Sequence, residues 1–212
     1  MYIAIEGVIG VGKTSLARMI QTELDAELLL EVFEENPFLS DFYGDRRRYA
    51  FQTQIFFLLS RYRQQRGLSE SLAANGSLIA DYTFQKDAIF ARLNLDGDEL
   101  DTYHLVHNAL AERIHPPDLT VYLQVDTKVA MQRIALRDRP YERNMERDYI
   151  QNLNQAYEEY FAAFKDPLLK IETSNLDFVA NRDHLTFITD RIKAKLGIPP
   201  YQHELPFEED AP

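Results

Sequence analysis

Apolar residues along the chain gather in short runs, and longer stretches with a helical spacing of apolar positions separate them. The short runs cover 2–6, 27–32, 77–81, 119–125 and 168–172. The helical patterns cover 13–25, 46–74, 85–95, 98–114, 127–137, 145–164 and 181–196. Short apolar strands that alternate with longer helices are typical of a parallel sheet with crossover helices. The pattern therefore predicts an α/β fold with a five-stranded parallel sheet flanked by helices.

The size and composition of the chain suit a single domain. Its 212 residues include 45% hydrophobic and 27% charged residues, which are values typical of globular proteins. We expect one domain over 1–198 and a proline-rich, acidic tail over 199–212. The longest unbroken apolar run, 55–59, is far shorter than the roughly 20 residues that cross a bilayer. Because the sequence has no cysteine and no secretory pattern at its start, we expect a cytoplasmic protein.

The charge balance argues against a nucleic-acid polymer or an anionic membrane as a partner. The chain carries 23 basic and 34 acidic residues, a net charge of −11, and like charges repel. An anionic substrate must then be held by locally concentrated positive charge. Basic residues do gather at 46–48 and again between 133 and 147.

The stretch after the first predicted strand has the spacing of a phosphate-binding loop. Gly7, Gly12, Lys13 and Thr14 match the pattern Gly-x4-Gly-Lys-Thr between a predicted strand and a predicted helix. Glycines allow the backbone turns that aim successive N–H groups at phosphates, and the following helix presents its positive end. Lys13 would neutralise the β- and γ-phosphate oxygens of a nucleotide. The candidate nucleotide-binding residues are Gly7, Gly10, Gly12, Lys13, Thr14 and Ser15.

Two groups suit the Mg²⁺ ion that accompanies a bound nucleoside triphosphate. One is the hydroxyl of Thr14 in the loop. The other is the carboxylate of Asp81, which ends an apolar strand, as the metal-ordering aspartate does in such sites. A strand-terminal aspartate also often caps a helix, and this alternative stays open.

An arginine-rich stretch follows the fourth predicted strand. Arg133 and Arg137 lie four residues apart on one helical face, and Arg139 and Arg143 follow in a loop. Guanidinium groups that close over a transferring phosphoryl group are what a small-molecule kinase needs, because that chemistry is mostly charge stabilisation. The alternative is a solvated basic face, for which Asp138 and Glu142 supply part of the acidic partners. The Asn-Lys-x-Asp element with which GTPases read guanine does not occur in the sequence.

These motifs together resemble the deoxynucleoside kinase family, and within it the bacterial deoxyadenosine and deoxyguanosine kinases. The likeness extends from the loop to about Phe178. It implies a P-loop kinase fold with a short arginine-rich lid at about 137–145. It also implies an enzyme of nucleotide salvage that uses Mg²⁺ and transfers the γ-phosphate of ATP to the 5′-hydroxyl of a deoxyribonucleoside. A homodimer is implied by the resemblance as well.

The resemblance assigns the role of general base to Glu31. This residue ends the second predicted strand, where the family has a Glu-Pro-Val segment, and a carboxylate there could take the 5′-proton. Val32 stands where the family usually has proline, which leaves the acid intact. Glu34 and Glu35 are alternative bases that we expect to face solvent.

The segment 43–61 resembles the nucleoside pocket of the family. Tyr43 is expected at the sugar 3′-hydroxyl, Gln54 at the edge of the base and Arg61 deeper in the pocket. Gln54, Phe57 and Arg61 are spaced to share one helical face, although Phe57 could equally be a core residue. A buried amide such as that of Gln54 pairs with both a donor and an acceptor on a base.

The segment after the third predicted strand is expected to form the other side of this pocket. By resemblance, Asp87 pairs with the base and Phe90 stacks on it. Tyr82 stands where the family has an arginine that steadies the phosphoryl oxygens and the base carboxylate. Either Lys86 or a lid arginine substitutes for that charge, or the chain is a weakened kinase.

The resemblance also assigns residues beyond the fourth predicted strand. Those expected on the phosphates are Arg133, Arg137 and Arg139. Glu142 is expected to reach back to the sugar 3′-hydroxyl. Asp177 and Phe178 are candidates for the adenine pocket of ATP, with helix capping as the alternative for Asp177.

Two other functions stay open from the sequence. A nucleoside-monophosphate kinase such as thymidylate kinase shares the loop and lid, but it needs a cationic clamp for the acceptor phosphate. The other is a nucleotide-binding regulatory partner made inactive by Tyr82. The segments "EENPFL" and "KDAIF" resemble those of bacterial deoxyadenosine and deoxyguanosine kinases, and this resemblance implies a purine acceptor with deoxyadenosine ahead. Gln54, Arg61 and Asp87 occur in relatives that use either class of base.

Overall fold

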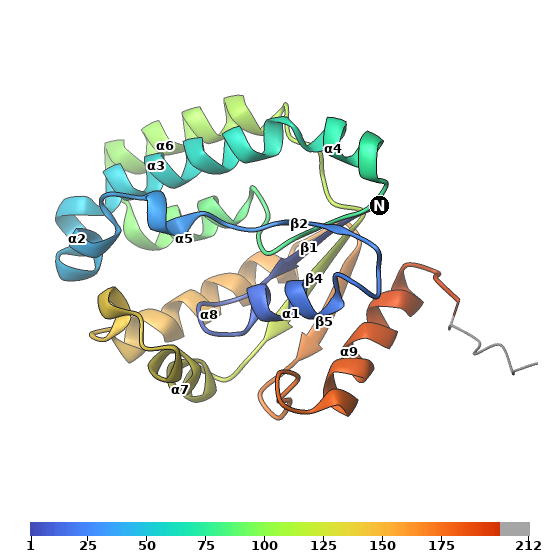
Figure 1. Cartoon of the computed structure of the whole chain (residues 1–212). Coiled ribbons are helices and arrows are strands. Elements are labelled where there is room, and N and C mark those ends of the chain that lie inside the picture. Colours follow the sequence, from blue (N-terminus) through green and yellow to red (C-terminus); the bar gives the residue numbers. More distant parts are fainter. Residues whose placement is uncertain (200–212) are drawn as a thin grey trace, which may run out of the picture.

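The computed structural model of the chain describes residues 1–199. At its centre lies a five-stranded parallel sheet with the strand order β2-β3-β1-β4-β5 (Figure 1). The strands are β1 (Tyr2–Glu6), β2 (Glu27–Leu29), β3 (Leu78–Ala80), β4 (Leu119–Gln124) and β5 (Leu168–Glu172). This architecture confirms the predicted α/β fold. The predicted tail lies outside the described residues from position 200 onward.

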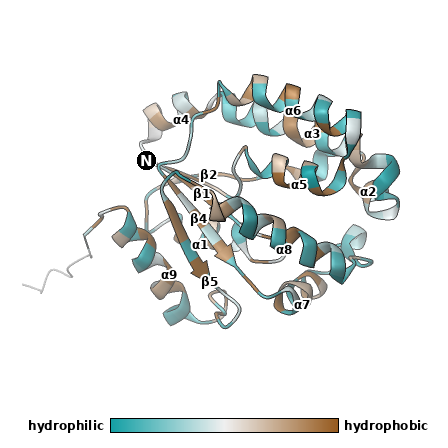
Figure 2. Ribbon diagram, turned by 180° about the vertical axis from the view of Figure 1, so that it is seen from behind, coloured by the Kyte–Doolittle hydropathy of each residue, from teal (hydrophilic) through white to brown (hydrophobic). Residues whose placement is uncertain are grey.

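The inner strands are apolar on both faces, which is why they form the middle of the sheet. Every residue of β1 is buried, and β4 is buried from Leu119 to Leu123. Strands of a parallel sheet that are covered by helices on both faces read as continuous apolar runs, not as alternating ones. Figure 2 shows the hydrophobic colouring concentrated on the strands, with hydrophilic faces on the surrounding helices.

Helices connect the strands and cover the sheet. They are α1 (Lys13–Ile20), α2 (Leu39–Gly44), α3 (Arg46–Arg66), α4 (Leu68–Asn75), α5 (Lys86–Asn94), α6 (Gly97–Ala111), α7 (Thr127–Arg137), α8 (Arg147–Ala162) and α9 (Arg182–Lys195). Two short 3₁₀ turns, η1 (Phe33–Glu35) and η2 (Pro140–Glu142), lie near the end of β2 and after α7. Among the described residues, none of the helices has the length and apolar character needed to cross a bilayer.

The structure corrects several predicted boundaries. The predicted helix 46–74 is two helices, because the backbone leaves helical geometry at Gly67 between α3 and α4. The second strand ends at Leu29 instead of 32, because the next backbone groups bond to side chains. The Gln64 amide donates to the Leu30 carbonyl, and the Glu31 N–H donates to Asp81. Helix α2 was not predicted, and its six residues are too few for helical periodicity to stand out.

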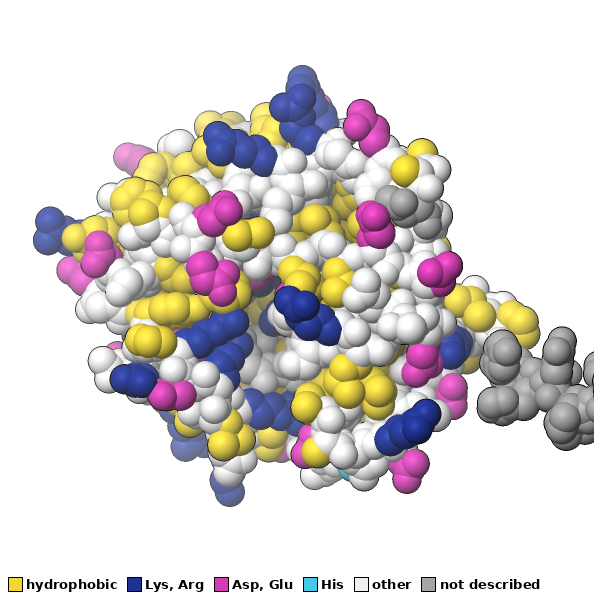
Figure 3. Space-filling view, in the orientation of Figure 1, with side chains coloured by type: hydrophobic (Ala, Val, Ile, Leu, Met, Phe, Trp, Pro, Cys, Tyr) yellow, Lys and Arg dark blue, Asp and Glu magenta, His cyan; other side chains and the backbone are white. Residues whose placement is uncertain are grey.

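The buried apolar residues form three clusters, and the two largest organise the elements into two groups. The larger core holds the sheet together with α1, α8 and α9, and we call these elements with α7 the sheet group. The smaller core lies among α2, α3, α5 and α6, the helical group, around Phe42, Leu58, Phe84 and Tyr103. The third cluster joins α4 to the start of β1 and β3. Helices α3 and α6 run side by side within the helical group (Figure 1). Figure 3 shows a hollow in the middle of this face of the molecule, with basic side chains beside it.

Candidate active site

A cavity of about 110 Å³ opens where the carboxyl ends of β1, β2 and β3 meet the helical group. The predicted residues that line it are Gly10, Lys13, Thr14, Glu31, Tyr43, Gln54, Phe57, Arg61, Asp81, Asp87, Phe90, Arg137, Arg139 and Glu142. Lys86, one of the two proposed substitutes for the missing arginine, lines it as well. Residues far apart in the sequence thus share one cavity. Open α/β sheets usually bind ligands at the carboxyl ends of their strands, where the strand order reverses direction.

The phosphate-binding loop joins β1 to α1 and depends on its glycines. Gly7 and Gly12 have φ angles of 146° and 109°, which residues with a side chain rarely adopt. A Cβ atom on Gly12 would lie 2.7 Å from the ring of Phe178, so this glycine also lacks space for a side chain. The loop is therefore fixed by backbone conformation and close packing together.

Lys13 begins α1 and folds back over the loop. Its Nζ donates to the carbonyls of Gly7 at 2.7 Å and Val8 at 3.1 Å. Burial, followed by the positive charge of Lys86, lowers the pKa of Lys13 to about 8. The ammonium is therefore charged at neutral pH but close to its titration range.

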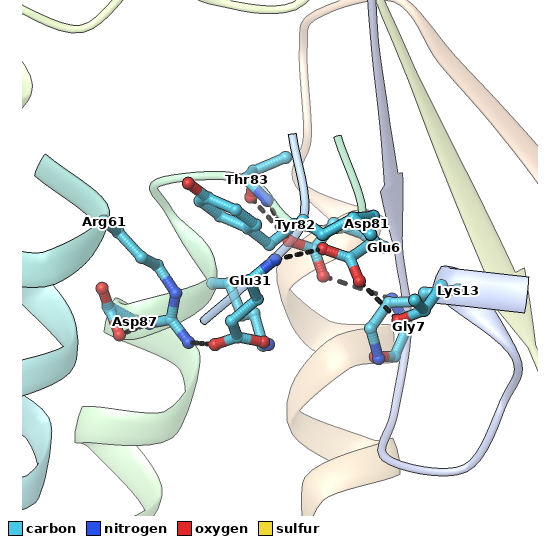
Figure 4. A network of polar contacts seen from close by, with 12 residues as sticks. Glu6, Gly7, Lys13, Glu31, Arg61, Asp81, Tyr82, Thr83 and Asp87 are labelled. Atoms are coloured by element: carbon cyan, nitrogen blue, oxygen red, sulfur yellow. Dashed lines mark hydrogen bonds and ion pairs between the residues drawn. The ribbon is translucent and has the colours of Figure 1, made fainter. Parts of the chain in front are cut away.

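Asp81 connects the loop with the end of β2. Its Oδ2 accepts a hydrogen bond from the Thr14 hydroxyl, and its Oδ1 accepts one from the Glu31 N–H at 2.8 Å (Figure 4). The two residues predicted to order Mg²⁺ are thus in direct contact. The Asp81 carboxylate therefore positions both Thr14 of the phosphate-binding loop and the main chain of Glu31, the proposed general base.

Glu31 follows β2 and lies in the cavity between two positively charged side chains of the helical group. Its carboxylate pairs with Arg61 of α3 and with Lys86 of α5, and its side chain is 14% exposed. Burial acts to raise the pKa of Glu31, but the charges and hydrogen bonds of Arg61 and Lys86 outweigh it and hold that pKa well below its usual range. Glu31 is therefore ionised at all physiological pH values. Glu34 and Glu35, the alternative bases, are exposed.

The deeper part of the cavity carries polar side chains on an apolar wall. Arg61 pairs with Asp87 as well as with Glu31, and its guanidinium lies 5.0 Å from the ring of Phe57. Gln54 is buried, with no partner in the described residues for its Oε1. A buried amide acceptor without a partner costs free energy unless a ligand satisfies it. This part of the cavity therefore suits a flat polar ligand with a donor group.

The lid closes the outer end of the cavity through one carboxylate. Glu142 is almost fully buried and accepts from Arg137 Nε at 2.9 Å and from Nη2 at 2.7 Å, while Arg139 lies 3.7 Å away. The ring of Tyr43 stacks on Tyr141 of the lid, with ring centroids 6.0 Å apart. The two lid arginines are therefore held at the cavity, and neither reaches Glu31 in this structure.

Other predicted residues lie outside the cavity. Arg133 donates to the carbonyls of Val11, Thr173 and Leu176 at 2.9 to 3.1 Å, so its guanidinium ties the loop to the segment after β5. Phe178 is buried against Gly12. Asp177 is exposed, and its Oδ1 accepts from the Ala180 N–H at 3.0 Å in the turn before α9. The residue that caps α9 is Asn181, so the alternative of helix capping by Asp177 is wrong. The remaining loop residue, Ser15, is exposed on α1.

The chain is similar to known kinases over nearly its whole length. A family model described as "Deoxynucleoside kinase" matches residues 3–196. The chain belongs to the deoxynucleoside kinase family. Deoxyguanosine kinase of Bacillus subtilis (strain 168) is 32% identical to it over 198 residues, which is 91% of this chain and 96% of the relative. The deoxyadenosine/deoxycytidine kinase of the same organism is 29% identical over 199 residues, 90% of each chain.

Solved structures of this deoxynucleoside kinase family share the fold. The structure of deoxyadenosine kinase from M. mycoides with the products dCMP and dCDP superposes with a TM-score of 0.80 at 28% identity, covering 92% of this chain and 100% of that one. The predicted family, the P-loop kinase fold and the kinase class of enzyme are thereby confirmed.

Sequence reasoning missed one central residue of this kinase site. Glu6 ends β1 and is fully buried. Its carboxylate accepts from the Gly7 N–H at 3.2 Å and from the Thr83 hydroxyl at 2.9 Å (Figure 4). It also accepts from the Tyr157 hydroxyl at 3.1 Å. It thus joins the start of the loop to the segment after β3 and to α8. The signal was an acid at the end of a wholly apolar strand, where a charge needs buried partners.

Proposed function

We propose that this deoxynucleoside kinase transfers the γ-phosphoryl group of ATP to the 5′-hydroxyl of a purine deoxyribonucleoside, with deoxyadenosine preferred. The observation that carries the proposal is that the Glu31 carboxylate opens into the same cavity as Lys13 of the loop. A base and a phosphate-binding cation that share one cavity are what an in-line transfer to a hydroxyl needs.

In the proposed reaction, a bond forms between the 5′-oxygen of the nucleoside and the γ-phosphorus, and the bond from that phosphorus to the ADP oxygen breaks. The proton of the 5′-hydroxyl passes to Glu31. Lys13, Arg137 and Arg139 neutralise charge on the phosphate oxygens, since such transfer depends chiefly on positioning and electrostatics. Because Glu31 is ionised at neutral pH, it is ready to accept the proton.

The residues present fit a magnesium ion that enters with ATP. The Thr14 hydroxyl and the Asp81 carboxylate already contact each other at the edge of the cavity. Oxygen ligands of this number suit Mg²⁺, which usually keeps several waters and shares its sphere with phosphates. When bound near Thr14 and Asp81, the ion would supply positive charge that neutralises the negative charge developing on the phosphate oxygens.

The charge of the cavity supports a neutral acceptor over a nucleoside monophosphate. The described cations that line the cavity outside the loop each lie beside a carboxylate: Arg61, Lys86, Arg137 and Arg139. A second phosphate would need free cations to replace its hydration. The rival thymidylate-kinase function is thus less well supported than a nucleoside kinase.

The purine preference is supported by the relatives and by the polar groups of the pocket. Gln54 and Asp87 offer an amide and a carboxylate that suit the amino group and ring nitrogen of adenine. Of the solved relatives, the M. mycoides deoxyadenosine kinase has been determined with dATP and also with dCTP. That relative therefore binds nucleotides of both classes of base.

Two features of the protein outside the cavity complete the proposal. A homodimer is supported by the exposed leucines Leu59 of α3 and Leu105 of α6, on helices that lie side by side. A cytoplasmic location is supported by the ATP and nucleoside substrates together with the absence of cysteine from the sequence.

The test is a substrate panel with the purified full chain, ATP and Mg²⁺. The acceptors are the four deoxyribonucleosides and thymidine monophosphate, and ADP formation is measured for each. We expect the highest kcat/KM for deoxyadenosine. Turnover of the monophosphate alone would favour the thymidylate-kinase function, and tight ATP binding without turnover would favour a regulatory partner.

A further inference from the structure

The site contains a buried lysine whose position is unfavourable for the fold itself. Lys86 is the first residue of α5, and its side chain is 7% exposed. Burial disfavours a charged ammonium. The positive end of a helix disfavours it as well. Lys86 is therefore held there by a specific partner, which is the carboxylate of Glu31.

Tyr82 makes no contribution to the charge of the cavity. Its ring is fully buried and does not line the cavity, and its hydroxyl donates to Gln64 Oε1 at 2.9 Å. Figure 4 shows the ring directed away from Lys13 and the loop. The two lid arginines pair with Glu142 instead of Glu31. The cations that contact Glu31 are therefore Arg61 and Lys86 alone among the described residues.

The two cations beside Glu31 are not equivalent. Arg61 also pairs with Asp87, so its guanidinium is fixed between two carboxylates. Among the described residues Lys86 forms an ion pair with Glu31 alone, and it lines the same cavity as Lys13 of the loop. Its ammonium also lies 5.6 Å from the centre of the Phe90 ring. A lysine has a flexible stem and three rotatable donors, whereas a guanidinium is a rigid fork. Lys86 is thus the cation that is able to move between the base and the phosphates.

From this geometry we propose that Lys86 is a catalytic residue, which holds Glu31 in the resting site and donates to the transferring phosphoryl group during the reaction. As the 5′-oxygen bonds to phosphorus and the bond to the ADP oxygen breaks, the proton goes to Glu31. The carboxyl group is then neutral, so its attraction for Lys86 falls. The released ammonium turns to the oxygens of the transferred group, where negative charge remains. This inference rests on the proposed function.

The first test compares Lys86→Met, Lys86→Arg and the control Lys128→Met, which changes an exposed lysine on α7 outside the cavity. We expect Lys86→Met to lower kcat roughly 100-fold, the scale found when one charge-stabilising donor is removed. Lys86→Arg should restore at least a tenth of kcat, because the charge returns, and Lys128→Met should match the wild type. A kcat for Lys86→Met within threefold of wild type would overturn the proposal.

A second readout separates a catalytic role from a purely structural one. Single-turnover experiments with excess enzyme give the rate constant of the transfer and its amplitude separately. If Lys86 acts on the transferring phosphoryl group, Lys86→Met should lower the rate constant and leave the amplitude and ATP binding nearly unchanged, because the ion pair of Glu31 with Arg61 remains. A folding defect alone would lower the amplitude and leave the rate constant unchanged, and that result would contradict the proposal.

Failure of the role proposed for Lys86 gives a different result from failure of the proposed function. If the wild-type chain phosphorylates no deoxyribonucleoside, the proposed function is wrong. If the wild type is active and Lys86→Met is equally active, the function stands and the role of Lys86 is wrong. Thermal unfolding of each variant, with and without ATP, verifies that the compared proteins are folded.

Discussion

The two sides of the cavity are built in different ways. The loop on the phosphate side is one continuous stretch of sequence between β1 and α1, and its shape depends on glycines with positive φ angles. Lys13 is held there by carbonyls of the same loop. The nucleoside side consists of side chains from the end of β2, from α3 and from α5, held together by ion pairs. We therefore expect ATP affinity to fall when a side chain is added to a glycine of the loop. We expect kcat to fall when a charged side chain on the nucleoside side is neutralised.

Asp81 couples these two sides. It accepts from Thr14 on one side and from the Glu31 N–H on the other. The buried carboxylate of Glu6 likewise accepts hydrogen bonds from two segments, from the Gly7 N–H at the start of the loop and from the Thr83 hydroxyl after β3. The alignment of donor and acceptor thus depends on two carboxylates at the ends of neighbouring strands.

The largest expected effect comes from neutralising the nucleoside side. Glu31→Gln should lower kcat by roughly 100-fold or more, because loss of a general base costs about 10²- to 10⁴-fold. ATP affinity should stay nearly unchanged, since the loop is intact. Steady-state kinetics and ATP titration measure both quantities. The matched control is Glu35→Gln, an exposed acid on η1 that should behave as wild type; equal losses in both variants would remove Glu31 from the mechanism.

The next effect is expected from adding one carbon to the phosphate side. Gly12→Ala forces a φ of 109° on a residue with a side chain and brings Cβ to 2.7 Å from the ring of Phe178. Strain of about 1–3 kcal/mol is the usual cost of such a conformation, so ATP affinity should fall roughly tenfold or more. The control is Gly67→Ala, where φ is −86° and nothing lies within 4 Å of the added carbon. Equal ATP affinities for the two variants would show that the loop tolerates side chains.

A third effect concerns the pH dependence of the phosphate side. Lys13 has a pKa of about 8 in the free protein and is charged below that pH. Above pH 8 the neutral amine no longer attracts phosphates, so kcat/KM for ATP should fall about tenfold for each further pH unit. Because the charge of Lys86 contributes to this lowering, Lys86→Met should move the alkaline limb to higher pH. A profile that stays flat to pH 9.5 would contradict the assignment.

The smallest effect is expected at Tyr82, which belongs to neither side of the cavity. Tyr82→Phe removes only the hydrogen bond to Gln64 Oε1, made at 2.9 Å. The free energy of unfolding should fall by about 1 kcal/mol, a typical net value for one hydrogen bond. Chemical denaturation measures this loss, and kcat should stay within twofold of wild type. A tenfold drop of kcat would instead place the hydroxyl in the mechanism.

Sequence reasoning succeeded where structure is local. The loop motif lies within nine residues, and strand–loop–helix context sufficed to predict it. It failed for β2, which ends early because the side chains of Gln64 and Asp81 take over its backbone bonds. Gln64 is more than thirty residues away in sequence, so no periodicity near β2 reports this contact.

The lid shows the same limit for a site residue. The spacing of Arg133, Arg137 and Arg139 suggested three equivalent arginines. In the fold only the last two line the cavity, while Arg133 bonds to carbonyls of the loop and of the segment after β5. The packing of α7 against the rest of the protein decides which of these arginines faces the cavity. The residues next to the arginines in sequence do not reveal this packing.

The sequence by itself determined the parallel sheet, the phosphate-binding loop and the family, because apolar periodicity and glycine spacing are properties of adjacent residues. It left open which cation compensates for Tyr82. Tertiary structure decided which cations contact Glu31. Helix α5 packs beside α3 and brings Lys86 to this carboxylate, while Glu142 pairs with Arg137 and Arg139. Ion pairs between distant elements depend on distances of a few ångströms in the folded chain, and those distances exist only after the apolar cores have formed.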